Sequence, residues 1–508
     1  MSISMMLFAF AGGTGSESDP WEVQTAEHLD ALRNYLGSAH SDKYYIQTAD
    51  INLNMPPWNS GEGWIAIGTS STNSFRGHYN GDGYSVNGPF SERYYTDWQG
   101  LFGYTYSGSI TNLHLSNVNI TGWSADYIGG LVGRAANTTI SNCSVTGSVT
   151  GRDYVGGLLG MYSNGNMTDC TSNVNISSSR NYGGGLVGST GNYSTLTNCS
   201  SSGTVTGGAI KGGLAGMVGV NTALSNCHST GSVEGSEQLG GLVGYNGDGY
   251  IHNCSSTGNV FGTYSLVGGL VGFNYNSSGV LGRGLITCSY STGNVTGTAQ
   301  SAGGLVGSNS GWSNIEDCFS RGNVQGSEKV GGLVGRNLLS AQISTSFSTG
   351  TVGGTGLLGG LVGSNESDAT VTASYWDIDT SAMSISAGGS GKNTASMTWP
   401  YAADTFVGWD FIDVWIEDTS YALNDGYPFL FGFGGPPLLP PVIVSITITG
   451  GIVEIIWEEI PGATGYRIEG SDEPYTGFVL LDTVGAVTEW TSLGPLPESQ
   501  FYRVIAFM

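Results

Sequence analysis

The chain has 508 residues and a formal net charge of −24, from 15 Lys plus Arg against 39 Asp plus Glu. This balance argues against binding to nucleic acid or to anionic membrane surfaces, because both require clustered cations. Glycine accounts for 85 residues, but the three-residue period of collagen is absent. Tight bends repeated along the chain would require that much glycine.

The N-terminal stretch Met1–Ala11 is apolar apart from two serines. Ala9-Phe10-Ala11 followed by Gly12 resembles the small-residue cleavage site of a signal peptide, although no Lys or Arg precedes the apolar run. We therefore expect residues 1–19 to be a signal-peptide remnant or a disordered N-terminus, and the protein to be secreted or held at a cell surface. No later stretch is long enough to form a transmembrane segment.

Residues 20–96 are predicted to form an N-terminal cap and the first coils. Trp21–Gly37 has the pattern of a short amphipathic helix, with Thr25 as N-cap and Gly37 as its stop. Tyr44–Leu53 alternates between apolar and polar residues like a strand. A helix in this place would cover the open first coil of a repeat array.

A Gly-Leu-Val-Gly phrase and its variants recur through the body of the chain. A period so regular predicts stacked units, each too small to bury its own apolar face. We therefore predict an all-β fold in which residues 97–375 form a parallel β-helix, or solenoid, with about three short strands in each coil. The leucine of the phrase stands at positions 101, 131, 158, 186, 214, 242, 270, 305, 333 and 361.

Each repeat also contains a strand whose alternate residues are small or apolar. Cys254, Ser256, Gly258 and Val260 share one parity, so all four point the same way, which we take to be inward. The same frame recurs in the other repeats. The predicted outward face carries threonines, namely Thr146, Thr230, Thr257, Thr292 and Thr349.

The chain has seven cysteines, and we expect each to occupy the same inward place in its own repeat. An odd number argues against a disulfide framework, and the spacing is not that of a metal site. We therefore predict a column of free thiols that fill the core as small hydrophobes, with no metal and no cofactor. These cysteines are Cys143, Cys170, Cys199, Cys227, Cys254, Cys288 and Cys318.

A column of asparagines follows the Gly-Leu-Val-Gly phrase by two residues. Asn tolerates the left-handed backbone of a tight corner, and stacked amides can bond one another. We interpret this column as structural. Its members are Asn246, Asn274, Asn309, Asn337 and Asn365.

Three tyrosines form the candidate ligand-binding site. Tyr127, Tyr154 and Tyr182 each stand two residues before the Gly-Gly-Leu of their repeat, so they should stack on adjacent coils as a platform for sugar rings. The alternative is an aromatic stack that only stiffens three coils. The insertion at 274–284 is either a loop on a binding face or a passive bulge.

The C-terminal part of the chain changes in composition. Residues 376–435 are rich in aromatics and suit a C-terminal cap, and the proline-rich 436–441 suits a stiff linker. Residues 442–508 contain several short strands. The last strand of this module cannot be identified, which leaves an unpaired edge beside Phe501–Phe507. Either the gene is truncated or a partner strand fills the gap, and self-association through this module is one outcome.

Two resemblances follow from these residues. Trp457, the Pro-Gly-Ala-Thr-Gly-Tyr run ending at Tyr466, and Phe501–Val504 resemble a fibronectin type III or Ig-like module. The Gly-Gly-Leu-Val-Gly unit with its Cys-Ser-Ser-Thr-Gly-Asn-Val strand resembles the GLUG repeat of bacterial surface proteins, over about 20–430. The GLUG resemblance implies an exported right-handed β-helix of adhesin type. It carries no catalytic residue, and no histidine begins a His-Glu-x-x-His motif.

The favoured function is that of a non-catalytic surface protein, adhesin-like or structural, which binds extracellular glycans or surface proteins. A second candidate function is that of a polysaccharide-degrading enzyme: a hydrolase would need paired carboxylates, and a lyase would need a cation or base near acidic sugars. Asp126 and Asp153, in equivalent places on adjacent coils, give this second candidate weak support. A fibre-forming subunit and an ice-binding file of threonines are also compatible with the sequence. We predict no catalytic residues.

Overall fold

The computed structural model describes residues 9–432 except 265, 281 and 299, and then 443–449, 452–458, 465–471, 479–485, 487–492 and 501–507. The chain divides into two compact units. Unit 1 comprises Met1–Thr419 and Gly426–Leu430, and unit 2 comprises Ser420–Asp425 and Phe431–Met508. The predicted proline-rich linker at 436–441 lies outside the described residues, as do residues 1–8 of the expected signal remnant.

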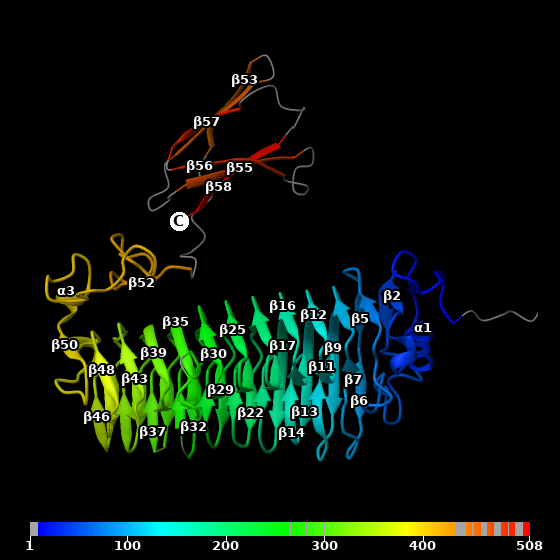
Figure 1. The fold of residues 1–508 in the computed structure, drawn as a ribbon, viewed down its shortest axis with the longest axis horizontal. Helices are drawn as coiled ribbons and strands as arrows, with labels where there is room; N and C mark the ends of the chain where they lie inside the picture. The colour runs from blue at the N-terminus through cyan, green and yellow to red at the C-terminus, as the bar shows by residue number, and fades with distance from the viewer. Residues whose placement is uncertain are drawn as a thin grey trace, which may run out of the picture. The chain divides into compact units, whose positions relative to one another are not determined.

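Unit 1 is the predicted parallel β-solenoid, which is thereby confirmed (Figure 1). Each coil of the body adds a strand to a ten-stranded sheet and one to a nine-stranded sheet, and neighbouring coils pair in parallel. The ten-stranded sheet contains β7 (Phe102–Tyr106), β11 (Val132–Ala136), β15 (Leu159–Ser163), β19 (Val187–Thr190), β24 (Ala215–Val218), β29 (Val243–Gly247), β34 (Val271–Asn276), β38 (Val306–Gly311), β42 (Val334–Leu338) and β47 (Val362–Asn365). The nine-stranded sheet contains β10 (Asp126–Gly129), β14 (Asp153–Gly156), β18 (Gly183–Gly184), β23 (Lys211–Gly212), β28 (Leu239–Gly240), β33 (Leu266–Gly268), β37 (Ser301–Gly303), β41 (Lys329–Gly331) and β46 (Leu357–Gly359).

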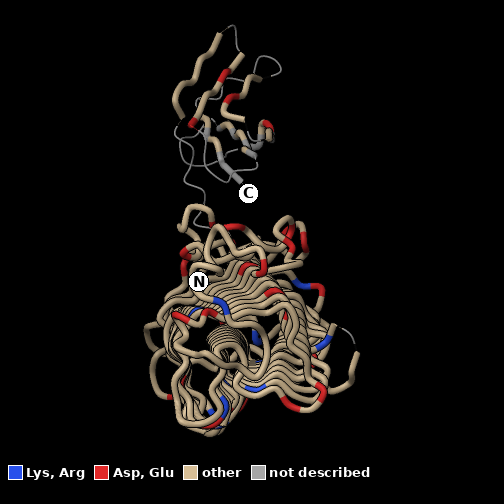
Figure 2. The backbone as a smooth tube through the Cα atoms, turned by 90° about the vertical axis from the view of Figure 1, so that its left-hand side faces the viewer, with Lys and Arg blue, Asp and Glu red and all other residues tan. Residues whose placement is uncertain are grey.

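A third sheet of 31 strands completes each coil and continues into both ends of the solenoid. One coil contributes β12 (Thr139–Ser141) and β13 (Ser144–Gly151), and the next contributes β16 (Asn166–Thr168) and β17 (Thr171–Ser178). Viewed along the solenoid, the coils superpose and carry few charged residues (Figure 2). This repetition follows from the repeat length, because every coil of similar length returns the chain to the same place.

The interior is built from columns of equivalent residues, as the sequence predicts. The leucine of every Gly-Leu-Val-Gly phrase is fully buried. Cys254, Ser256, Gly258 and Val260 are all buried in the interior, although this stretch contains two short strands, β31 (Ser255–Ser256) and β32 (Val260–Gly262), and not one. Glycine is required where coils approach each other: a Cβ at Gly258 would lie 2.0 Å from the carbonyl oxygen of Gly231. The close stacking of the coils therefore depends on glycine.

The thiol column is confirmed for six cysteines and is wrong for Cys288. The register pairs Ser289, and not Cys288, with Cys318. Cys288 has a φ of +46° and is only half-buried, at the corner that precedes the inward place. The reason is one residue of spacing, since Ile251 precedes Cys254 by three residues whereas Ile286 precedes Cys288 by two. All seven cysteines are free.

The asparagine column forms a chain of amide hydrogen bonds through the interior. The Nδ2 of Asn246 donates to the Oδ1 of Asn274 at 2.8 Å, and the donation repeats from Asn274 to Asn309 at 2.9 Å. It continues through Asn337 to Asn365 at 3.0 and 2.9 Å. The structural interpretation is confirmed, but the left-handed corner belongs to other residues. A second column of corner asparagines has positive φ, namely Asn112, Asn142, Asn198, Asn226 and Asn253.

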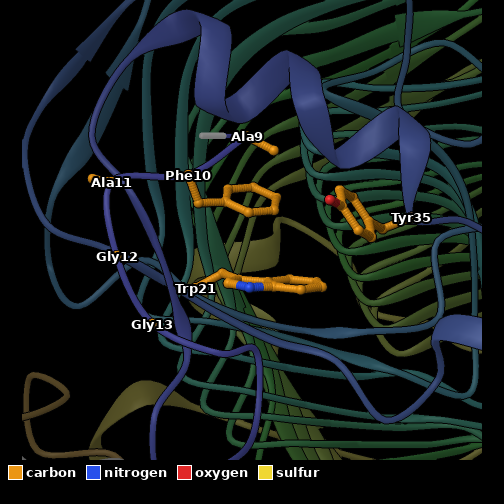
Figure 3. A pocket seen from close by; sticks show the side chains of 7 residues that line it. All are labelled: Ala9, Phe10, Ala11, Gly12, Gly13, Trp21 and Tyr35. Atoms are coloured by element: carbon orange, nitrogen blue, oxygen red, sulfur yellow. The ribbon is translucent and has the colours of Figure 1, made fainter. Parts of the chain in front are cut away.

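The N-terminal end of the solenoid is covered by a short helix and a cluster of aromatic rings (Figure 3). The helix α1 spans Ala26–Ala31, and the Thr25 side chain accepts a hydrogen bond from the His28 backbone N–H. It is shorter than predicted, because Trp21–Val23 forms β1 and pairs in parallel with β2 (Tyr44–Gln47). Phe10 is buried and stacks on Trp21 with ring centroids 4.9 Å apart. Cleavage after Ala11 would remove this ring.

The aromatic residues that follow the last coils pack on the outside of the third sheet. Strands β49 (Tyr375–Asp377) and β50 (Ser390–Lys392) continue that sheet, and the short helices α2 (Ile378–Ser381) and α3 (Thr394–Met397) flank β50. Outward rings of successive coils stack from Tyr290 to Phe319 and Phe347, and Trp415 packs on two of them. Thr349, predicted to be exposed, is buried. The exposed threonine face therefore stops at Thr292.

The first residues of the insertion at 274–284 extend β34, which ends at Asn276, and the described residues after it form a turn. The Nδ2 of Asn276 donates to the carbonyl oxygens of Val280 and Arg283 at 3.1 and 3.0 Å, which closes the turn. A Cβ on Gly279 would lie 3.1 Å from the indole ring of Trp312 on the next coil, so the turn lies against that exposed ring. The contacts give the insertion a defined conformation.

Unit 2 contains two antiparallel sheets of three strands each. One joins β53 (Ile443–Thr449), β54 (Ile452–Trp457) and β57 (Glu489–Thr491), and the other joins β56 (Val479–Gly485), β55 (Gly465–Ser471) and β58 (Phe501–Phe507). Trp457 packs on Tyr466 at 5.1 Å in a small buried core. Within the described residues β58 is an edge strand. The resemblance to a fibronectin type III module stays a prediction.

Candidate ligand-binding surface

The three predicted tyrosines are brought together on adjacent coils. The ring centroids of Tyr127 and Tyr154 lie 4.6 Å apart with the planes 11° from parallel, and those of Tyr154 and Tyr182 lie 4.8 Å apart at 22°. Each tyrosine has a left-handed backbone, with φ of +60°, +55° and +54°. They occupy the corner where the chain enters the nine-stranded sheet. The repeated corner therefore places the rings in register.

The stacking decides which parts of the rings a ligand can contact. Each face of the central ring is covered by a neighbour, so the stack presents ring edges and phenol hydroxyls. Burial raises the pKa of Tyr127 and of Tyr154 above the ordinary value for tyrosine. The hydroxyls therefore stay protonated at neutral pH and can donate hydrogen bonds. This surface suits a polar ligand that lies along several coils.

The carboxylates beside the stack are held in ion pairs. Asp126 and Asp153 pair in register on adjacent coils, as the sequence indicates. Arg152 donates two hydrogen bonds to Asp126, at 2.8 and 2.7 Å. Asp153 accepts a hydrogen bond from the Asn181 backbone N–H at 2.7 Å and lies 3.8 Å from the guanidinium of Arg180. These contacts give both carboxylates a structural role at the corner.

A second outward column, on the ten-stranded sheet, lies beside the tyrosines and has no counterpart among the sequence predictions. The guanidinium carbon of Arg134 lies 5.7 Å from the ring centroid of Tyr127 and 5.4 Å from that of Tyr104. Further along the column, Tyr245 and Phe273 stack at 5.5 Å. Residue types vary in this column, so no repeat marks it. The members of this column are Tyr104, Arg134, Met161, Ser189, Met217, Tyr245, Phe273, Ser308, Arg336 and Ser364.

A shallow groove of about 400 Å³ opens beside Arg134. It lies at the corner where the ten-stranded sheet ends and the next turn begins. Tyr193 projects there with 65% of its surface exposed. The groove is lined by Arg134, Met161, Ser163, Asn164, Gly191, Asn192 and Tyr193.

No group of three or more His, Cys, Asp or Glu that could hold a metal ion occurs among the described residues. Within the same part of the chain, no helix is long and apolar enough to cross a membrane.

The repeats match a known motif. The GLUG motif is found at residues 124–150, 179–206, 235–260 and 298–325. Each match spans parts of one coil and the start of the next, including the corner with the tyrosine column or its equivalent. The chain thus carries four GLUG motifs within a β-solenoid, as the sequence resemblance predicts.

Two curated proteins share part of the chain. A "Putative Gly-rich membrane protein" of Evansella cellulosilytica is 37% identical over 137 residues, which is 27% of this chain and 15% of that protein. "Halomucin" of Haloquadratum walsbyi is 34% identical over 151 residues, which is 28% of this chain and 2% of that protein. The matched regions are therefore small parts of both relatives.

Among solved structures, an IgA1 protease covers 53% of this chain and 21% of its own, at 18% identity and a TM-score of 0.40. A tailspike protein of the E. coli bacteriophage HK620 covers 91% of this chain and 81% of its own, at 10% identity and a TM-score of 0.28.

Proposed function

We propose that this chain is the exposed part of an exported, non-catalytic surface protein that binds extracellular glycans or other extracellular partners. The observation that carries the proposal is the register of Tyr127, Tyr154 and Tyr182 on the outside of the solenoid. Stacked phenols on successive coils offer a row of equivalent hydrogen-bond donors. A polymer with repeating hydroxyl or carboxyl groups can contact such a row at several points at once.

The surrounding surface supports the same function. The second column beside the tyrosines presents aromatic and methionine side chains, and both types give large contact areas at binding surfaces. The charge of −24 keeps such a rod soluble and disfavours its self-association in solution. The names of the two relatives, a membrane protein and a halomucin, agree with a place at the cell surface.

The test is binding of the full chain to a glycan array, with two substitutions at each tyrosine of the stack. We expect the triple Tyr127/Tyr154/Tyr182→Phe variant to keep the stack but to lose at least tenfold in affinity, because only the hydroxyls are removed. The triple Ala variant should lose more. Tyr264→Ala, at an exposed tyrosine elsewhere, is the matched control. Binding unchanged in both triple variants would exclude the stack from the site.

A further inference from the structure

We propose that the groove beside Arg134 binds the carboxylate of an acidic sugar, such as a uronic acid residue within a polysaccharide. The inference rests on the proposed glycan-binding function and names the class of sugar that the surface takes. It depends on one cation whose charge the protein does not neutralise, and on the polar and aromatic groups around that cation.

The arginine is held in place but is left without a partner. Its guanidinium lies close to the rings of Tyr104 and Tyr127, at 5.4 and 5.7 Å, and these contacts orient it. Its Nε is buried and has no hydrogen-bond partner, and no ion pair of Arg134 occurs among the described residues. By contrast, Arg152 and Arg336 reach a carboxylate at 2.7 and 2.6 Å. The Nε is enclosed, but Arg134 as a whole is half-buried and lines the groove, so an anion in the groove can approach its guanidinium.

Carboxylates outnumber cations in this chain, with 39 acidic residues against 15 basic ones. Among the described residues, a carboxylate lies within ion-pair distance of Arg33, Arg93, Arg152, Arg180 and Arg336, whereas none lies so close to Arg134. The guanidinium presents a planar pair of N–H donors that matches a carboxylate bidentately. An anionic ligand group is therefore the partner that this position lacks.

The rest of the groove provides what a sugar ring needs. Tyr193 lines the groove, is exposed and has a left-handed φ of +56°, which is unusual for a bulky residue. Asn164 and Asn192 come from turns of adjacent coils, and the Asn164 N–H donates to the Asn192 carbonyl oxygen at 3.1 Å. Their side-chain amides line the opening and are exposed. Amides of this kind can bond sugar hydroxyls, and a tyrosine ring can lie against the sugar's apolar face.

These groups together define an orientation for the ligand. The carboxylate would meet Arg134 at the floor of the groove, while the ring would lie towards Tyr193 and its hydroxyls towards the two amides. The volume of about 400 Å³ accommodates one or two sugar residues. No covalent step is involved, and the site binds without turnover.

The experiment compares matched ligands with the full-length protein. Calorimetry would use an oligogalacturonate, its methyl ester, a sulfated oligosaccharide of equal length and a neutral cello-oligosaccharide. Because the methyl ester differs only in charge and one methyl group, it isolates the contribution of the carboxylate. We expect the acid to bind at least tenfold more tightly than its ester. Preference for the sulfated ligand would overturn the assignment to a carboxylate, and equal affinity for acid and ester would overturn the inference altogether.

Variants separate the groove from the tyrosine stack. Arg134→Gln and Tyr193→Ala should each weaken binding of the acid at least tenfold. Arg134→Lys should give an intermediate loss, because lysine keeps the positive charge but lacks the planar pair of N–H donors. Arg283→Gln, at an arginine in the turn after β34 and outside both the groove and the tyrosine stack, is the control and should bind normally. If the acid binds Arg134→Gln unchanged, the inference fails. If only neutral glycans bind, through the tyrosines, the inference fails while the proposed function stands.

Discussion

Lys211 occupies a place in the interior where the adjacent coils carry Gly183 and Leu239. Its side chain is fully buried and fills the space beside Gly183, where an added Cβ would lie 2.7 Å from the lysine Cδ. The ammonium donates to the carbonyl oxygens of Arg180 and Ala209. Burial lowers the pKa of Lys211 from 10.5 to about 7, partly offset by the charge of Asp153.

This shift predicts how stability depends on pH. Between pH 7 and 10.5 the unfolded chain holds a proton on Lys211 that the folded chain has released, so folding becomes more favourable as pH rises. One pKa unit corresponds to about 1.4 kcal/mol, so the gain across this range is roughly 3–5 kcal/mol. Lys211→Met keeps the apolar stem and removes the charge. We expect the variant to lack this rise, whatever its absolute stability.

The assay is urea unfolding of the wild type and Lys211→Met at pH values from about 6 to 10, followed by circular dichroism. All other titratable groups are common to both proteins, so the difference between the curves isolates the lysine. Lys329→Met is the control, because the Lys329 ammonium pairs with Glu366 at 3.1 Å near the surface. Parallel curves for the wild type and Lys211→Met would refute the reasoning.

Three further predictions concern the repeated columns and one ion pair. Cys227→Ser should change the unfolding free energy by less than about 1 kcal/mol in a denaturant titration, because serine already fills the thiol column in other coils. A loss above about 3 kcal/mol would contradict this expectation. Asn309→Ala leaves buried amide partners on both sides unpaired and should lower the free energy of unfolding by about 3 kcal/mol or more. Asn365→Ala, at the end of the column, should cost less than half as much. Equal losses would argue against a continuous amide chain. The pKa of Glu366 is lowered from 4.5 to about 2, chiefly by Arg336, so the wild type should lose stability as pH falls through that range. Glu366→Gln should lose less, and identical melting temperatures against pH in the two proteins would contradict the pairing.

Much of the interior could be predicted from the sequence, because the residues that recur in every repeat are the ones that every coil buries. The leucine at position 131 has an equivalent in each repeat, and all ten of these leucines are fully buried in the interior. The amide chain through Asn274 follows from the same recurrence. Counting from the preceding isoleucine would also have placed Ser289 in the inward column instead of Cys288.

The outside of the solenoid was harder to predict, since each coil there carries a different residue. The surroundings of Arg134 are set by Tyr104 and Tyr127, which belong to different sheets and do not stand at equivalent positions of the repeat. Thr349 is buried in the coil where Trp409, from beyond the last coil, packs on the outward ring of Phe347. Contacts of this kind depend on tertiary structure and leave no periodic signal in the sequence.

The central claim is that the rod binds extracellular glycans on its surface without altering them. The most direct measurement is incubation of the full chain with immobilised polysaccharides, in which retention is followed by interferometry and released fragments by mass spectrometry. We predict retention that depends on Tyr127, Tyr154 and Tyr182, with no new chain ends. Release of fragments, or an absence of retention on every polysaccharide that carries uronic acids or neutral sugars, would contradict it.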